Sequence, residues 1–423
     1  MIRILVVGGT WTVEPMNAFE TERRSKIVAK VGDELANYCL EHYGKDFHMR
    51  VCNGGCYYDL ENILNKTLEY DIVFWWANVP DNTLPKIRDV KEVAPHVMLV
   101  TSKRNDGDKY TFMELTQRAL ASKSNLVFEF KRNAREGGDE HSNKMFHINV
   151  FDPLGCQWYG GLNITEAVCA AMNRLEYLRS ITRQNTVQST TDKNLVLAWY
   201  FDQFKQEQYQ SEKVVNIPDE SEFVDIVRKH AETFYQIMSP GKHVERFLGN
   251  ASMRPMPPQV GRCSRGMPSF RHGEYIFVSQ RNVDKQFIDL EHFVPCYMES
   301  DKLYYCGENK PSVDAPIQVR LYEALPHINY IIHSHCYIED ARFTSKSIPC
   351  GAIEEVDEVL EVIKKMDEEY PEATKDTRGC SKDAKPFMYA INLKGHGSLV
   401  LATNAKTMRN IKYVGRQMPE MMF

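Results

Sequence analysis

The sequence contains no apolar stretch long enough to cross a lipid bilayer. A membrane helix needs about 20 mainly apolar residues, whereas the run at residues 72–79 is short and has the composition of a strand. The first residues also lack the charged start, long apolar middle and small-residue cleavage site of a secretory signal. We therefore expect a cytoplasmic protein that has no membrane among its partners.

Disulfide frameworks and basic surfaces are missing from the sequence as well. The 11 cysteines are odd in number and form no C-x-x-C pair, which indicates reduced thiols, most of them in the core. The 57 acidic residues outnumber the 52 lysines and arginines, and the formal net charge is -5. Because nucleic-acid binding needs a basic surface, nucleic acid is not an expected partner.

The first part of the chain has the pattern of an α/β domain. A chain of 423 residues is too long for one ordinary core, so we expect two domains. Continuous β-prone apolar runs alternate with segments of helical period; the runs lie at residues 2–7, 71–79, 96–101, 125–130 and 145–151. Such runs are typical of strands buried on both faces. They predict a Rossmann-like domain over 1–185, with a largely parallel sheet and helices on both faces.

A change of composition predicts the domain boundary. Polar residues at 182–193 are followed by an aromatic-rich helical stretch around Trp199 and Phe204, and these features predict a helical linker over 186–220. The second domain, 221–423, begins with an amphipathic helix at 221–238 that places Phe223 and Ile226 on one face. Short β-like runs and two helical segments follow, so this domain is also expected to be α/β.

Three histidines in the second domain have the pattern of a metal site. His333 and His335 follow directly after the apolar run 328–332. Because alternate side chains of a strand point to the same face, both imidazoles can meet one ion. His396 lies between two glycines, which let the backbone come close to a site. Three neutral imidazoles with an open fourth position are typical of catalytic Zn²⁺, and another divalent metal would fit the same set. The alternative is an ordinary pair of polar residues at a strand end.

The motifs around these histidines occur in a fixed order. Residues 310–316 read K-P-S-V-D-A-P, the His-x-His strand follows a proline at 326, and His396 forms the later turn. This order resembles the class II aldolase/adducin family, whose members have a "KPSSE" helix start, a strand that ends in "H-T-H" and a later "N-H-G" turn. Residues 277–285 also look like its "TPSGVDK" element. The resemblance covers about 221–415 and implies an α/β domain with a mixed central sheet, and often a tetramer.

The resemblance implies roles for particular residues. His333, His335 and His396 match the zinc ligands, and Asp314 stands where the aldolases have a glutamate that works as acid and base. Tyr413 is the only candidate for the catalytic tyrosine of the C-terminal tail. The family's substrate-phosphate residues, in its "G-N-x-S" and "S-G" turns, would correspond to Arg262, Ser264, Arg281 and Asn282. Arginines there would bind an anion or form salt bridges. Ser312 is a further candidate for substrate binding.

The start of the chain resembles another family. Gly8, Gly9 and Thr10 follow the first strand, with Glu14-Pro15 behind them. This pattern is similar to the "GGT-x-E-P-I-D" start of the synthetase half of the phosphopantothenoylcysteine synthetase/decarboxylase proteins, over about 1–180. The resemblance implies nucleotide binding at Gly8, Gly9 and Thr10, because a glycine turn before a helix can hold phosphate with backbone amides. Tight-turn glycines are also common for structural reasons alone.

These observations favour a metal-dependent aldehyde-lyase. The expected reaction is retro-aldol cleavage, or a related epimerisation, of a small anionic hydroxy-carbonyl compound such as a sugar phosphate. The expected assembly is a homo-oligomer, either a tetramer or a dimer. Two alternatives stay open: a nucleotide-dependent ligase or ligand-binding protein, and a non-catalytic scaffold like adducin, which lacks the metal histidines.

Overall fold

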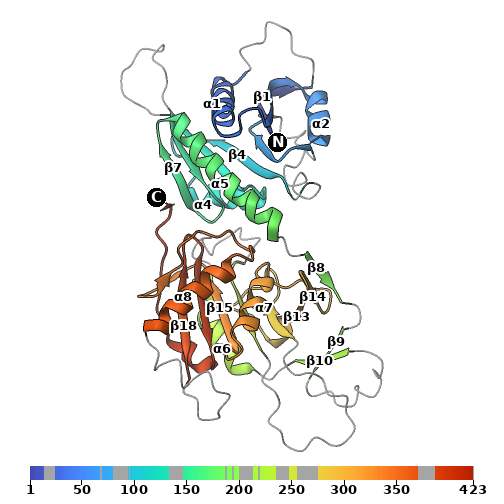
Figure 1. Ribbon diagram of the computed structural model, residues 1–423, viewed down its shortest axis with the longest axis vertical. Coiled ribbons are helices and arrows are strands. Elements are labelled where there is room, and N and C mark those ends of the chain that lie inside the picture. Colours follow the sequence, from blue (N-terminus) through green and yellow to red (C-terminus); the bar gives the residue numbers. More distant parts are fainter. Residues whose placement is uncertain are drawn as a thin grey trace, which may run out of the picture. The chain divides into compact units, whose positions relative to one another are not determined.

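The computed structural model divides the chain into two compact units (Figure 1), formed by residues 1–184 with 417–423 and by residues 185–416. It describes residues 1–13, 24–66, 69–79, 94, 96–132, 146–185, 188–192, 195–199, 213–217, 220–234, 247–254, 275–369 and 386–422. Among the helices in these ranges, none is long and apolar enough to cross a membrane.

The first unit is built on an eight-stranded sheet with the order β2-β1-β3-β4-β5-β6-β7-β21. The strands are β1 (Ile2–Thr12), β2 (Phe47–Cys56), β3 (Ile72–Trp75), β4 (Met98–Arg104), β5 (Leu126–Arg132), β6 (Phe146–Phe151), β7 (Cys156–Gly161) and β21 (Glu420–Met421). The first five in spatial order are parallel, and β6 is antiparallel to both of its neighbours. The predicted, largely parallel sheet is confirmed.

Helices cover both faces of this sheet because its strands are apolar on both sides. Ile4 and Val6 pack with α1 (Lys26–Tyr43) and α5 (Ile164–Asn185) on one face. Leu5 and Val7, which alternate with them, pack with α2 (Tyr57–Asn65) on the other face. On that second face Val127 packs with α4 (Phe112–Ala121). The alternation within each strand therefore builds separate cores on the two faces of one sheet.

The second unit is built on a nine-stranded sheet with the order β17-β18-β19-β15-β11-β12-β13-β14-β8. The strands are β8 (Gln188–Thr191), β11 (Asn250–Met253), β12 (Ile276–Ser279), β13 (Phe293–Glu299), β14 (Lys302–Tyr305), β15 (Tyr330–Ser334), β17 (Arg342–Phe343), β18 (Met388–Leu393) and β19 (Gly397–Ala402). The two outermost pairs are parallel and the inner pairs antiparallel. The predicted mixed sheet is confirmed.

The two faces of the second sheet carry different helices. Ile331 belongs to a core shared with α7 (Ala315–Ala324) and α8 (Glu355–Glu369), whereas Ile332 packs on the opposite face with α6 (Ser221–Lys229). The 3₁₀ helices are η5 (Ala231–Phe234), η6 (Leu290–His292) and η7 (Ala405–Asn410). The small two-stranded sheets pair β9 (Leu195–Trp199) with β10 (Lys213–Ile217) and β16 (Tyr337–Ile338) with β20 (Tyr413–Val414).

The boundary region differs from the helical linker that composition predicted. Its described parts are strands, because the apolar residues of β9 pair with those of β10 and because β8 joins the edge strand β14. The helix expected at 221–238 is α-helical as far as Lys229 and is followed by η5. Residues 235–238 of the expected helix lie outside the described part of the chain. At the other end, residues 417–423 group with the first unit because β21 pairs with β7.

Candidate functional site

The three predicted metal ligands lie together on the second sheet. His333 is in β15, His335 follows that strand, and His396 lies in the turn between β18 and β19. Because β15 and β19 are antiparallel neighbours, the start of β19 lies beside the end of β15. One ring nitrogen from each histidine falls within 4.8 Å of the others. All three side chains are buried, with only 1–2% of each residue exposed.

The hydrogen bonds of these histidines leave nitrogen lone pairs free. Nδ1 of His333 donates to the Ser398 carbonyl at 3.0 Å, and Nδ1 of His396 donates to Oε1 of Glu355 at 2.9 Å. The Nε2 atoms of both residues, and Nδ1 of His335, are buried and have no hydrogen-bond partner among the described residues. Buried polar atoms are rarely left in this state. Convergent imidazoles, two of which have their second nitrogen held by a hydrogen bond, fit a divalent metal ion.

The surroundings favour neutral imidazole at two of the three positions. Burial and the neighbouring His396 lower the pKa of His333 to about 4, and burial and His333 lower that of His335 well below its usual value. Burial also opposes protonation of His396, but the Glu355 carboxylate outweighs it and raises the pKa of that imidazole. Metal ligation requires the neutral ring, so His333 and His335 are prepared for it at neutral pH.

Asp314 lies next to this cluster at the start of α7. Its Oδ2 is 3.9 Å from Nε2 of His333 and accepts a hydrogen bond from Asn250 Nδ2 at 2.7 Å. Its Oδ1 accepts from the Cys350 thiol at 3.3 Å. Although Asp314 occupies the N-cap position, its side chain makes no capping hydrogen bond. The carboxylate is therefore directed to the histidine cluster and does not serve the helix.

Asn250 lies in a literal copy of the family's "G-N-x-S" motif. The family's "G-N-x-S" turn was expected at residues 261–264, but the literal string is Gly249-Asn250-Ala251-Ser252, at the start of β11. The Asn250 side chain contacts both Ser312 and Asp314, so this string is the one at the site. Arg262 and Ser264 lie outside the described residues.

The other expected substrate-binding residues meet at the end of β12. Arg281 N donates to the Lys310 carbonyl at 2.9 Å, and Ser312 N donates to Ser279 O at 3.0 Å, which brings the two turns side by side. Asn282 has a φ of 64°, a left-handed conformation that asparagine tolerates better than most residues. The family's turn has glycine at this point, so the backbone shape is retained while the side chain differs.

Tyr413 lies on the other side of the sheet from Asp314. Its ring is 5.3 Å from that of His230, within the core on the α6 face. His333 shares its side of β15 with Ile331, which packs on the α7 face. The structure thus brings together Asp314 and the three histidines, but it places Tyr413 behind them.

Several residues of the site were missed by sequence reasoning. Glu355 lies at the start of α8, 41 residues from the histidine that it contacts, and nothing in its local sequence marks it. Cys350 is exposed as a residue, but burial and the Asp314 carboxylate raise the pKa of its thiol well above the usual value, so it remains a donor. Lys285 is buried, and its Nζ donates to Leu248 O at 3.1 Å, which supports the turn before Asn250.

The first unit has a cavity of about 410 Å³ beside the predicted glycine turn. Gly9 and Thr10 line it together with Lys26 at the N-terminus of α1 and Arg104 at the end of β4. Trp76, Phe130 and Phe146 supply aromatic surface to the same cavity. Gly8 has a packing role instead, since an added Cβ would lie 2.5 Å from the Val28 methyl carbons.

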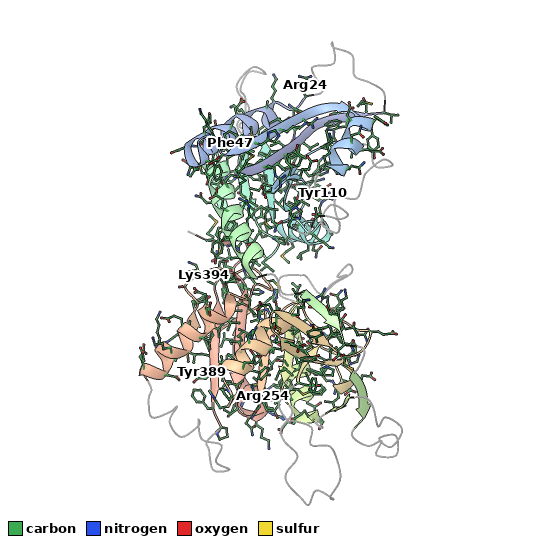
Figure 2. The ribbon with its side chains drawn as sticks, turned by 45° about the vertical axis from the view of Figure 1, so that its right-hand side comes forward. Arg24, Phe47, Tyr110, Arg254, Tyr389 and Lys394 are labelled. Carbon is green, nitrogen blue, oxygen red and sulfur yellow. The ribbon has the colours of Figure 1, made fainter. Side chains whose placement is uncertain are left out.

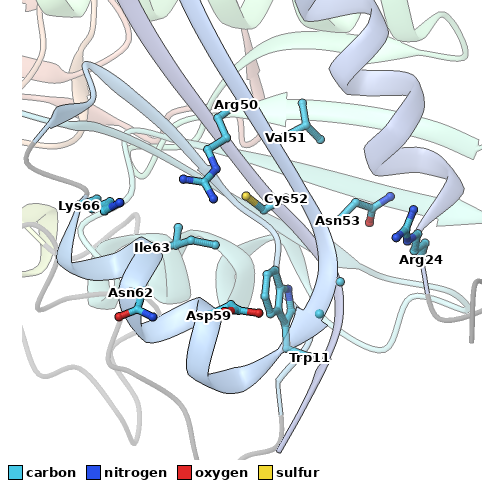
Figure 3. A pocket seen from close by; sticks show the side chains of 12 residues that line it. Trp11, Arg24, Arg50, Val51, Cys52, Asn53, Asp59, Asn62, Ile63 and Lys66 are labelled. Carbon is cyan, nitrogen blue, oxygen red and sulfur yellow. The ribbon is translucent and has the colours of Figure 1, made fainter. Parts of the chain in front are cut away.

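A second cavity, of about 550 Å³, lies along the edge strand β2 and α2 (Figure 3). Arg50, Lys66 and Trp11 border it from different sides in Figure 3, and Arg24 also lines it. The three predicted nucleotide-binding residues, Gly8, Gly9 and Thr10, do not line this cavity. Of these two cavities, the glycine turn faces the smaller one.

Comparison with known proteins identifies the class of the second unit. Residues 231–416 match the family described as "Class II Aldolase and Adducin N-terminal domain". The resemblance that the motifs of this part of the chain predicted is thus confirmed by a family match. None of the curated proteins compared with the chain matches it.

Several solved structures are similar to parts of the chain at low identity. The DNA/pantothenate metabolism flavoprotein from Streptococcus pneumoniae is 12% identical, with a TM-score of 0.31, over 42% of this chain and 98% of its own. An L-fuculose 1-phosphate aldolase is 15% identical, with a TM-score of 0.27, over 44% and 78%. YgbL from Escherichia coli, a putative aldolase/epimerase/decarboxylase, is 13% identical, with a TM-score of 0.25, over 46% and 92%.

The lowered pKa of His333 predicts how stability depends on pH in protein freed of metal by a chelator. The folded pKa of about 4 lies below the usual value of 6.5, so the unfolded chain binds the proton more tightly. The contribution of His333 to the free energy of unfolding should be fully present above pH 6.5 and be lost as the pH falls towards 4. Between these values the slope from this residue should be up to about 1.4 kcal/mol per pH unit. Denaturant unfolding of His333→Gln should show a shallower pH dependence than wild type. An unchanged slope would contradict the prediction.

Proposed function

We propose that this chain is a divalent-metal-dependent lyase of the class II aldolase type. It would catalyse retro-aldol cleavage, or a related epimerisation, of a small anionic hydroxy-carbonyl substrate. The observation that carries the proposal is the set of three buried, unpaired imidazole nitrogens beside the Asp314 carboxylate. Zn²⁺ is the metal that best suits three histidines with an open position.

The residues of the site divide the chemistry between them. His333, His335 and His396 would hold the metal, which when bound would polarise a substrate carbonyl and stabilise the negative charge that develops on its oxygen. Asp314 would transfer the proton at the carbon beside that carbonyl, since its carboxylate faces the cluster. Asn250 and the Cys350 thiol donate to its two oxygens and so fix its orientation.

The anionic group of the substrate would be bound at the turn formed by Arg281, Asn282 and Ser312. Arg281 is exposed at the end of β12, and a guanidinium can bind phosphate or carboxylate through two parallel hydrogen bonds. The Ser312 hydroxyl already accepts from Asn250, so it can donate to a ligand at the same time. Arg262 and Ser264, which lie outside the described residues, are further candidates for the same role.

The scaffold alternative is less well supported by the site. A non-catalytic module has no need for three buried nitrogens without partners, which cost free energy when nothing binds them. The family resemblance also makes a homo-oligomer, a tetramer or a dimer, part of the proposal.

A second function is proposed for the first unit, namely binding of a nucleotide or a nucleotide-like anion. It is favoured by the cavity of about 410 Å³ that opens at Gly9 and Thr10. This cavity lies where the strand order changes direction, between β1 and β3, which is the usual ligand position in doubly wound sheets. Its aromatic residues can contact a base, while Lys26 and Arg104 can contact phosphate.

The metal content of the purified protein tests the first proposal. Mass spectrometry should find about one divalent metal ion per chain in wild type and almost none in His396→Ala, because two imidazoles hold the ion far less tightly than three. His48→Ala, an exposed histidine on β2, is the control and should keep the metal. Absence of metal from wild type after loading with zinc would sink the proposal.

The role of Asp314 can be tested by aldehyde release from a panel of phosphorylated and unphosphorylated hydroxy-carbonyl compounds. Asp314→Asn should lower the rate about 10²- to 10⁴-fold, the usual contribution of a positioned acid-base group, while metal content stays at the wild-type level. Asp314→Glu restores the family's residue and should retain activity. Turnover by metal-free His335→Ala at the wild-type rate would exclude the mechanism.

Calorimetry with a panel of nucleotides tests the second proposal. Wild type should give saturable heat with at least one nucleotide, and Lys26→Ala should bind it about 10-fold more weakly, since a charge-assisted hydrogen bond is lost. Arg24→Ala is the matched control, because Arg24 is the neighbouring cation but lines the other cavity. Equal weakening by both variants, or no heat with any nucleotide, would count against this site.

A further inference from the structure

The guanidinium of Arg416 lies behind the turn that carries His396. Its two terminal nitrogens donate to consecutive backbone carbonyls, to that of Gly395 at 2.8 Å and to that of His396 at 3.0 Å. The residue is buried, with 9% of its surface exposed. A planar guanidinium can make two such bonds at once in fixed directions, whereas a lysine ammonium is a single point of charge.

Tyr337 contacts both the turn and the Arg416 guanidinium. The Arg416 guanidinium is 5.5 Å from the centre of the Tyr337 ring, and the Tyr337 hydroxyl accepts from Gly395 N at 3.0 Å. Both backbone polar groups of Gly395 are therefore engaged. On the other side of the turn, Gly397 approaches Ser334 so closely that an added Cβ would lie 2.0 Å from the Ser334 carbonyl oxygen. The turn is thus confined between Arg416 and the end of β15.

A short ladder places Arg416 beside Tyr337. Val414 in β20 pairs with Tyr337 in β16, and Lys412 O accepts from Glu339 N at 3.0 Å. Arg416 comes two residues after this ladder ends. The ladder therefore fixes the backbone from which the guanidinium extends, and the side chain is not free to leave the turn.

We propose that Arg416 is a positioning residue that sets the place of the His396 ring within the metal site. The proposal rests on the proposed metal-binding function of the three histidines. Glu355 fixes the ring through Nδ1, and Arg416 fixes the backbone that carries the ring. Without the guanidinium, two buried carbonyls lose their donors and the turn gains freedom to shift.

Arg416→Lys in the full-length protein tests the proposal. Lysine keeps the positive charge but lacks the two guanidinium nitrogens that donate to the Gly395 and His396 carbonyls. Arg254→Lys is a matched control in the same unit. Arg254 also donates to two backbone carbonyls, those of Tyr322 and Pro326, and also lies over a tyrosine ring, 5.1 Å from the centre of Tyr322. Figure 2 shows Arg254 at the opposite end of this unit from Lys394, the first residue of the metal turn.

Two measurements decide the outcome. Zinc affinity, measured by competition with a chromophoric chelator, should fall about 10- to 100-fold in Arg416→Lys and stay unchanged in Arg254→Lys. Amide hydrogen exchange of residues 394–398 in metal-free protein should become faster in Arg416→Lys alone.

Wild-type exchange at 394–398 in Arg416→Lys would overturn the proposal, as would a wild-type zinc affinity in that variant. If wild type itself binds no zinc, the metal function fails, and hydrogen exchange alone decides whether Arg416 positions the turn.

Discussion

The antiparallel pairing of β15 with β19 is the constraint on which the candidate site depends. It sets Ser334 opposite Ser398 and therefore brings the turn before β19 to the end of β15, where His335 lies. Gly397 permits this approach because a side chain there would collide with the Ser334 carbonyl. Two segments more than 60 residues apart thus supply three imidazoles to one place. Every other residue of the site is arranged around this pairing.

Burial gives the site its chemical character. A histidine that loses its water must find a hydrogen-bond partner, a proton acceptor or a metal ion. Here one nitrogen of His333 and one of His396 are held by Ser398 and Glu355, and these bonds fix which nitrogen carries the proton. Nε2 of His333, Nε2 of His396 and Nδ1 of His335 are buried and have no hydrogen-bond partner among the described residues. Because these nitrogens lack both water and hydrogen-bond partners, the cluster favours binding of a cation more than a solvated cluster would.

Local patterns allowed the ligands to be predicted, but not the residues that support them. The His-x-His alternation and the glycines beside His396 are short-range signals, and the buried apolar runs gave the strands of both sheets. Glu355 and Arg416 act through tertiary contacts from distant helices and turns, and no period or spacing connects them with His396. Asn250 could have been predicted, because Gly249-Asn250-Ala251-Ser252 is a literal match to the family's "G-N-x-S" motif. Within the described part of the predicted helical linker, Leu195–Trp199 pairs as a strand with Lys213–Ile217, a partner that no local pattern indicates.

In the proposed mechanism, aspartate at position 314 gives the acid-base group a shorter reach than the family's glutamate would have. Asp314 sits at the start of α7 and yet gives no hydrogen bond to the helix, which leaves both oxygens for Asn250 and Cys350. Those two donors hold the carboxylate 3.9 Å from the nearest imidazole nitrogen. A glutamate would extend one methylene further towards the cluster, so a substrate must come closer to α7 to exchange a proton with aspartate.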